Sequence, residues 1–269
     1  MKIDKEINNI AYNDEFHKYW NKQTSEIYTS VTTFIKLFEY SFDQDYFSKY
    51  KAIEKCDFEL FSKFKKLYGF KNVVSNYEKT NKFSENYINA QSEILKEWKE
   101  KNTLAIEKGL KRHKQEEEKV LKEGYFIFEN EKYLLKDKFE KSNKNEVFPE
   151  LLVYDNVFKI AGQCDIILKD KDNNITVIDY KTNESIDTKN SFQKMKKPIS
   201  HLDQCNYNTY CLQLSLYAYI LERKGFTVKD LYIFHMPEEN INNIIPCQYR
   251  KQELIYMLEL SQIFEGICL

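Results

Sequence analysis

The chain contains few residues that break regular structure and lacks the patterns that mark membrane or secreted proteins. Its 269 residues include four prolines and six glycines, with no Pro-rich or Ser/Gly-rich linker, so we expect short connections. No segment approaches the roughly 20 apolar residues of a membrane span, and the first residues lack the apolar core of a signal peptide. We therefore expect a soluble, cytoplasmic protein that does not contact membranes.

Close-spaced cysteines and a strong charge of one sign are also missing. The six cysteines include no Cys-x-x-Cys pair, which argues against zinc ribbons and favours reduced structural thiols. Only three arginines are present, and the formal net charge is −1. Because the overall charge does not indicate nucleic-acid binding, any surface of that kind must be local.

Hydrophobic periodicity divides the chain into a mostly helical part followed by an α/β part. Apolar residues recur at helical spacing in five segments, which are 31–50, 45–68, 84–121, 207–223 and 252–264. Short runs of β-branched and aromatic residues predict strands in seven segments, which are 125–129, 132–135, 147–154, 161–168, 175–178, 231–235 and 244–249. A small hairpin is expected within residues 10–27. These segments predict a helical accessory region at 1–100 and an α/β core at 101–269, with helices on both faces of a mixed sheet.

Two carboxylates and a lysine lie at the ends of adjacent predicted strands. Segments 161–168 and 175–178 flank a polar turn, which predicts an antiparallel hairpin. The hairpin reverses the chain between Asp165 and Asp179, so the two acids should be neighbours across the ladder. Lys181 follows Asp179 by two residues and should project from the same face.

A divalent cation is the simplest explanation for two neighbouring carboxylates. Asp165 and Asp179 would repel each other without one, and their hard oxygen ligands favour Mg²⁺ or Mn²⁺. Lys181 could then reach a metal-bound water or a phosphate. The alternative is that Asp165 merely opens a strand and that 179–182 is an ordinary solvated strand end.

Further motifs occur in a fixed order around this pair. Gly109 and His113 form a Gly-x-x-x-His upstream, Glu150 stands on the preceding strand, and Gln213-x-x-x-Tyr217 follows on a helix. In this order the motifs resemble those of the PD-(D/E)XK nuclease superfamily, in particular its RecB-like and lambda-exonuclease-like branch. The N-terminal segment resembles accessory regions of phage-encoded members. The resemblance implies a restriction-endonuclease-like α/β core.

The resemblance also implies a role for each motif. His113, Glu150, Asp165, Asp179 and the backbone carbonyl of Tyr180 would hold one or two divalent ions, with Mn²⁺ favoured by the imidazole. Asp165, Asp179 and Lys181 would be the catalytic residues, Lys181 orienting or deprotonating water and offsetting charge on the phosphate. Gln213 and Tyr217 would contact substrate and brace Lys181.

Several of these residues also have an alternative interpretation in which their role is only structural. His113 could be a surface histidine on a charged helix, and Tyr217 could simply be one of the many buried tyrosines. Glu150 could be a solvated strand-start acid, and Glu146 competes with it for the metal role. Gln213 is more specific evidence for the motif than Tyr217, since it is a polar residue flanked by leucines.

One departure from the family pattern concerns iron. Some relatives bind an iron–sulfur cluster through an upstream cysteine and a close-spaced trio after the core. Here Cys247 and Cys268 stand far apart, so we expect no cluster.

The function expected from these motifs is a divalent-metal-dependent DNA nuclease. An exonuclease acting on single strands or duplex ends in replication, recombination or repair is favoured, leaving a 5′-phosphate and a 3′-hydroxyl. Lys196 and Lys197 are the candidate cations for binding the DNA backbone, and a recombination or replication protein is a possible partner. The alternatives are an RNA endonuclease on the same fold and a non-catalytic nucleic-acid-binding subunit.

Overall fold

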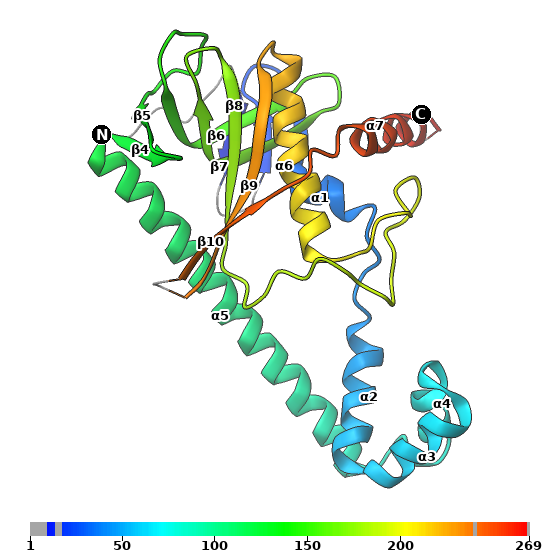
Figure 1. Ribbon diagram of the computed structural model, residues 1–269. Helices are drawn as coiled ribbons and strands as arrows, with labels where there is room; N and C mark the ends of the chain where they lie inside the picture. The colour runs from blue at the N-terminus through cyan, green and yellow to red at the C-terminus, as the bar shows by residue number, and fades with distance from the viewer. Residues whose placement is uncertain (1–9, 14–17, 239–240, 268–269) are drawn as a thin grey trace. The chain divides into compact units, whose positions relative to one another are not determined.

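The computed structural model describes residues 10–13, 18–238 and 241–267 (Figure 1). Contacts divide the chain into two compact units. The first comprises the residues up to Tyr40 together with those from Gly109 onward, and the second comprises Ser41–Lys108. The long helix α5 (Glu85–Glu123) begins in the second unit and ends in the first.

The first unit is built on a mixed sheet. Its ten described strands are β1 (Ile10–Asn13), β2 (Lys18–Asn21), β3 (Ile27–Ser30), β4 (Tyr125–Phe128), β5 (Glu131–Leu135), β6 (Glu146–Asp155), β7 (Ile160–Lys169), β8 (Asn174–Lys181), β9 (Thr227–Glu238) and β10 (Ile241–Pro246). The order β1-β2-β3-β7-β6-β5-β4 runs across the sheet, and β8, β9 and β10 branch from β7. Parallel pairs β3–β7, β5–β6 and β8–β9 mix with antiparallel ones.

Strand β7 lies at the branch point of this sheet. Along one edge it pairs with β6 from Ile160 to Lys169. Its other edge is shared, because β3 pairs with Ile160 and Ala161 while β8 pairs with residues 166–169. On this edge, residues 162–165 lie between the two partner strands.

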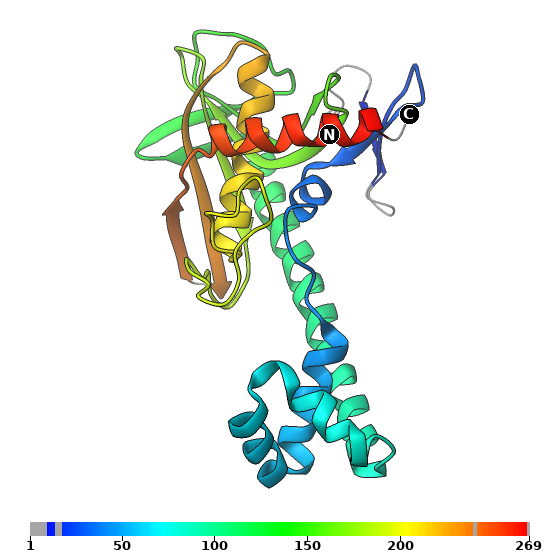
Figure 2. The same ribbon diagram turned by 90° about the vertical axis from the view of Figure 1, so that its right-hand side faces the viewer.

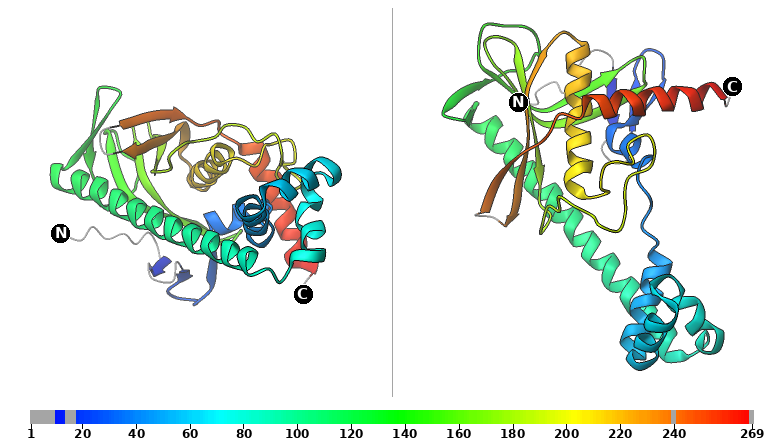
Figure 3. Two further views of the ribbon diagram at one scale, coloured as in Figure 1. Left: turned by 90° about the horizontal axis from the view of Figure 1, so that it is seen from below. Right: turned by 45° about the vertical axis from the view of Figure 1, so that its right-hand side comes forward.

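Helices cover both faces of the sheet. Three helices contribute to the main core on one face, which are α1 (Val31–Lys36), α6 (Asn206–Arg223) and α7 (Lys251–Ile267). Figure 2 shows α6 against the strands with α7 crossing beside it. The C-terminal end of α5 covers the opposite face, where Val120 packs against Ile166, Ile178 and Tyr180 (Figure 3, left). This confirms the predicted α/β class with helices on both faces.

The second unit is helical. Helices α2 (Gln44–Cys56), α3 (Phe58–Tyr68) and α4 (Val73–Asn81), the 3₁₀ turn Phe70–Asn72 and the N-terminal part of α5 enclose their own core. Side chains such as Ile53, Phe61 and Tyr87 are almost fully buried in it. Trp98 packs at its edge, where its ring lies 5.7 Å from that of Phe42.

The structure corrects the predicted helix at 31–50. Helix α1 begins at residue 31 as expected, where the Ser30 hydroxyl caps it by accepting the Thr33 N–H at 3.0 Å, but it ends at Lys36. A new helix, α2, starts after Asp43, whose carboxylate accepts the Tyr46 N–H at 2.9 Å. The apolar spacing runs on through Phe38 and Phe42, so periodicity alone could not locate the break.

The predicted division at residue 100 stays a prediction about domains. The contacts place the N-terminal strands with the sheet, since β3 pairs with β7, whereas only 41–108 forms a separate helical unit. Among the described helices, none combines the length and apolar character required to cross a membrane.

Candidate active site

The hairpin of β7 and β8 brings Asp165 and Asp179 to adjacent positions, as predicted. The regular ladder ends at the pair Ile166–Ile178, and the two acids are the next residues along each strand. There the Tyr180 backbone N–H donates to Asp165 Oδ2 at 2.6 Å. Asp165 and Asp179 are 8% and 3% exposed, so two carboxylates are buried side by side.

Lys181 and Gln213 both contact Asp179. The Lys181 ammonium forms an ion pair with Asp179 Oδ2, and the Gln213 amide donates to Asp179 Oδ1 at 3.3 Å. The expectation that Lys181 shares a face with Asp179 is thus confirmed.

His113 reaches the same group from α5. Its Nδ1 lies 3.2 Å from Asp165 Oδ1, and its ring stands edge-on to Tyr180 with centroids 5.9 Å apart. The imidazole is therefore held between the carboxylate of β7 and the aromatic ring of β8, and is not a free surface histidine.

Glu150 joins the group through the register of β6 and β7. The pairs Pro149–Ile166 and Leu151–Cys164 place Glu150 opposite Asp165. Its φ of +52° is unusual for a residue with a side chain, and the Gln163 amide donates to its backbone oxygen at 3.2 Å. The competing Glu146 is instead buried beside Lys169, 2.9 Å away.

These residues suit a divalent cation. One ligand atom from each of His113, Glu150 and Asp165 lies within 4.8 Å of the others. Ligands of one ion at about 2.0–2.6 Å from the metal are separated by such distances. Carboxylate oxygens with one imidazole nitrogen match Mg²⁺ or Mn²⁺.

The charges in this cluster are strongly coupled. Burial works against a charged His113, but the carboxylate of Asp165 outweighs it and raises the pKa of His113 to about 9. Burial would raise the pKa of Asp165, yet His113 and Lys181 hold it below its ordinary value. Burial raises the pKa of Asp179, and Asp165 adds to that effect.

Lys181 is protonated in the metal-free protein. Burial alone would lower its pKa, but Asp179 and Asp165 raise it above the ordinary value. A cation that retains its proton is suited to offset negative charge on a phosphate.

Helix α6 contacts Asp179 through Gln213. Gln213 donates to the Tyr217 hydroxyl at 3.2 Å as well as to Asp179. Tyr217 is 3% exposed and holds the Gln213 amide from within the core, and its predicted contact with substrate stays a prediction. A Cβ atom on Gly162 would lie 2.5 Å from Tyr217 Cε1, so glycine is required for this close approach.

Tyr210 of α6 also contacts the site, and the sequence analysis did not predict this. The Lys181 ammonium lies 4.8 Å from the ring centroid of Tyr210, and the Tyr210 hydroxyl donates to Asn183 Oδ1 at 2.7 Å. His235 Nε2 lies 2.7 Å from the backbone oxygen of Asn183. The available signal was the spacing of Tyr210, Gln213 and Tyr217, which places all three on one helix face.

The predicted DNA-binding lysines lie elsewhere. Lys196 donates to the Leu37 carbonyl at 3.1 Å and lies over the ring of Tyr40, and Lys197 is exposed. Neither contacts the carboxylates described above, so their role in binding DNA stays a prediction.

Comparison with known proteins agrees with this geometry. No match was found among curated proteins. The family model described as the PD-(D/E)XK nuclease superfamily matches residues 70–259, which include every site residue above. Because the match covers more than half of the chain, the chain belongs to the PD-(D/E)XK nuclease superfamily.

Proposed function

We propose that the protein is a divalent-metal-dependent DNA exonuclease of the RecB-like branch that acts in replication, recombination or repair. Members of the superfamily are metal-dependent nucleases. The main observation behind the proposal is that His113 and Glu150 lie beside the group formed by Asp165, Asp179 and Lys181. Two buried carboxylates, a third acid and an imidazole beside a fixed ammonium suit hydrolysis of a phosphodiester.

Each residue has a separate task in this proposal. His113, Glu150, Asp165 and Asp179 would hold Mg²⁺ or Mn²⁺, with the Tyr180 carbonyl as a further ligand. A bound ion supplies an activated water and stabilises charge on the phosphate oxygens. Lys181 places a positive charge where negative charge develops on the scissile phosphate. Gln213 keeps Asp179 in position through its amide, and the products would carry a 5′-phosphate and a 3′-hydroxyl.

The test uses end-labelled linear DNA and closed circular DNA incubated with Mn²⁺ or Mg²⁺. An exonuclease shortens the linear DNA from its ends and leaves the closed circle intact. Cleavage of the circle would instead indicate an endonuclease. Single-stranded and duplex forms of each substrate reveal which strand state is preferred.

Variants locate the activity in the proposed site. Asp179→Ala and Lys181→Ala should abolish cleavage, whereas Lys171→Ala, in the exposed turn of the same hairpin, should not change it. Full activity in either of the first two variants would contradict the assignment of the site. Thermal denaturation shows whether each variant remains folded.

The same protein preparation separates the two alternative functions. Cleavage of RNA but not of DNA would support an RNA endonuclease on this fold. Retained DNA binding without cleavage of either polymer would support a non-catalytic subunit that acts through a partner, such as a recombination or replication protein. A cytoplasmic location and the absence of an iron–sulfur cluster also stay predictions, and a brown, iron-containing preparation would contradict the latter.

A further inference from the structure

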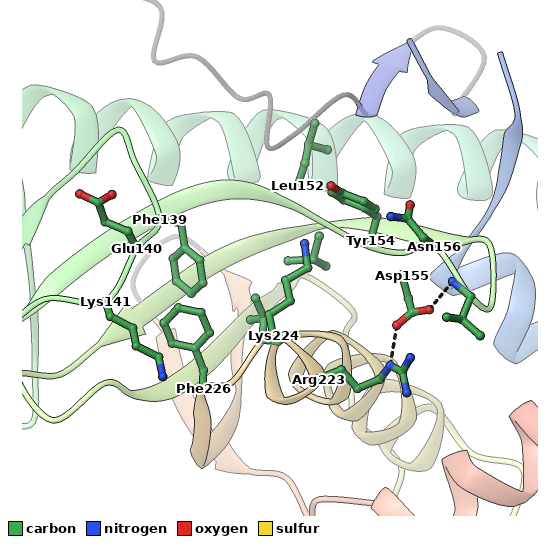
Figure 4. A pocket seen from close by; sticks show the side chains of 13 residues that line it. Phe139, Glu140, Lys141, Leu152, Tyr154, Asp155, Asn156, Arg223, Lys224 and Phe226 are labelled. Atoms are coloured by element: carbon green, nitrogen blue, oxygen red, sulfur yellow. Dashed lines mark hydrogen bonds and ion pairs between the residues drawn. The ribbon is translucent and has the colours of Figure 1, made fainter. Parts of the chain in front are cut away.

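A cavity lies in the first unit, at the end of β6. It measures about 660 Å³ and is bounded by the end of β6 and residues 156–157, the end of α6, the turn between α6 and β9, and residues 139–141 (Figure 4). Its lining includes none of the site residues His113, Glu150, Asp165, Asp179 and Lys181, although Leu152 stands only two residues beyond Glu150 on β6. The cavity is therefore separate from the carboxylate group.

The walls of this cavity are aromatic and aliphatic. The rings of Phe139 and Phe226 pack against each other in a tilted arrangement, with centroids 4.6 Å apart and 39° between the ring planes, and Leu152, Tyr154 and Leu221 line the cavity with them. Figure 4 shows the Phe139 ring directly above the Phe226 ring. Such a surface favours a flat apolar ring.

Both acids that line the cavity already have cationic partners. Asp155 accepts from Arg223 Nε at 2.6 Å and from the Val157 N–H at 2.8 Å, contacts that Figure 4 marks. Glu140 pairs with Lys138 at 2.7 Å. These pairs leave the two carboxylates without excess negative charge to offer a ligand.

The two lysines that line the cavity form no ion pair with the described residues. Burial lowers the pKa of Lys224, and the charge of Asp155 acts against that effect. Lys224 Nζ lies 4.0 Å from the ring centroid of Tyr154, and Lys141 Nζ lies 6.0 Å from that of Phe226. Within the described part of the chain, no carboxylate lies within 4.0 Å of either ammonium. An aromatic cavity with two unpaired ammonium groups suits a ligand that joins a flat ring to a phosphate.

We propose that this cavity binds a nucleotide unit, with its base against Phe139 and Phe226 and its phosphate at Lys141 and Lys224. The choice of a nucleotide among phosphorylated aromatic ligands rests on the proposed nuclease function. The unit has two sources with the same chemistry, which are a free nucleoside 5′-monophosphate and the terminal nucleotide of a DNA strand.

The test measures binding without cleavage. The full-length Asp179→Ala variant in EDTA is titrated by calorimetry with deoxyadenosine monophosphate, deoxyadenosine and inorganic phosphate. The monophosphate should bind at least tenfold more tightly than either fragment. Adding Lys141→Ala and Lys224→Ala should weaken its binding at least tenfold, whereas Lys144→Ala with Lys229→Ala, which removes equal charge outside the cavity, should not.

Two further measurements locate the ligand and identify its source. Backbone NMR shifts on titration should concentrate near Lys224 and Phe226. Displacement of the monophosphate by a 5′-phosphorylated oligonucleotide would assign the cavity to a strand end, and failure to displace it would assign the cavity to free nucleotide.

The proposal is overturned if the monophosphate does not bind, if the double lysine variant binds it unchanged, or if the shifts map to His113 and Asp165 instead. Because no step needs metal or turnover, this result is independent of the nuclease assay. If the protein cleaves DNA but does not bind the nucleotide, only the proposal for the cavity is rejected. If it binds the nucleotide but cleaves no DNA, only the proposed nuclease function is rejected.

Discussion

Asp165 Oδ2 accepts the backbone N–H of Tyr180 at 2.6 Å, in the place where the β7–β8 ladder has ended. The carboxylate thus substitutes for a strand carbonyl, and its second oxygen lies 3.2 Å from His113 Nδ1. One side chain is fixed by both β8 and α5 as a result. This arrangement gives Asp165 a structural role beside its proposed metal-binding role, and the two roles can be separated.

Substitutions at Asp165 should separate these roles. Asp165→Asn keeps an oxygen acceptor for the Tyr180 N–H, whereas Asp165→Ala leaves that buried donor unpaired. The alanine variant should therefore be less stable than the asparagine variant by about 1–3 kcal/mol, while both lose tight Mn²⁺ binding. Denaturant unfolding in EDTA and a Mn²⁺ titration measure the two effects, and equal stability of the variants would contradict the structural role.

The acid pair was predictable because its signal is local. Two apolar runs and a polar turn determine the hairpin, and the period of a strand then places Asp179 and Lys181 on one face. The choice between Glu146 and Glu150 was not predictable, because both lie on the same face of β6. It depends on the register with β7, which sets Glu150 opposite Asp165 and Glu146 opposite Lys169.

Contacts made across long stretches of chain were the least predictable part of the site. Tyr210 meets Lys181 only because α6 packs on β8 and β9. The spacing of Tyr210, Gln213 and Tyr217 indicates a shared helix face, but it does not show that this face lies beside Lys181. The break after α1 has a similar origin, since tertiary packing and the Asp43 cap override a continuing apolar period.

Tyr210 should tune Lys181 through its ring. Tyr210→Phe keeps the aromatic face over the ammonium, whereas Tyr210→Leu removes it. A cation–π contact contributes about 0.5–2 kcal/mol, so the leucine variant should lose between about twofold and thirtyfold in kcat. Steady-state kinetics on DNA measure the loss, with KM and Mn²⁺ affinity little changed. A phenylalanine variant as slow as the leucine variant would assign the effect to the hydroxyl and Asn183.

Gly162 should tolerate no side chain while Tyr217 remains. A Cβ atom there would lie 2.5 Å from Tyr217 Cε1 and 3.0 Å from Val31 Cγ2. Gly162→Ala should therefore cost about 1–3 kcal/mol of unfolding free energy, and adding Tyr217→Leu should recover part of it. Gly109→Ala is the matched control, because its Cβ would meet only Thr182 Oγ1, at 3.5 Å. Chemical denaturation compares the four proteins, and a fully stable Gly162→Ala variant would contradict the close approach.

His113 should make metal affinity depend on pH. In the metal-free protein its pKa of about 9 lies above the ordinary value of 6.5 because Asp165 outweighs burial. Proton binding at His113 thus stabilises the folded metal-free protein below about pH 6.5, and this contribution is lost as pH rises through about 9. Metal coordination requires the neutral imidazole.

Mn²⁺ affinity should consequently rise with pH, by up to about tenfold per unit between pH 6 and pH 8, because the metal displaces a proton throughout that range. Calorimetry in buffers of different ionisation enthalpy should detect close to one proton released per ion bound at pH 7. His113→Gln should flatten the pH dependence and remove this proton release, while Asp165 keeps a lowered pKa in the parent protein and stays ionised. An unchanged proton release in the His113→Gln variant would show that another group titrates, and His113 would then be excluded as the pH-dependent ligand.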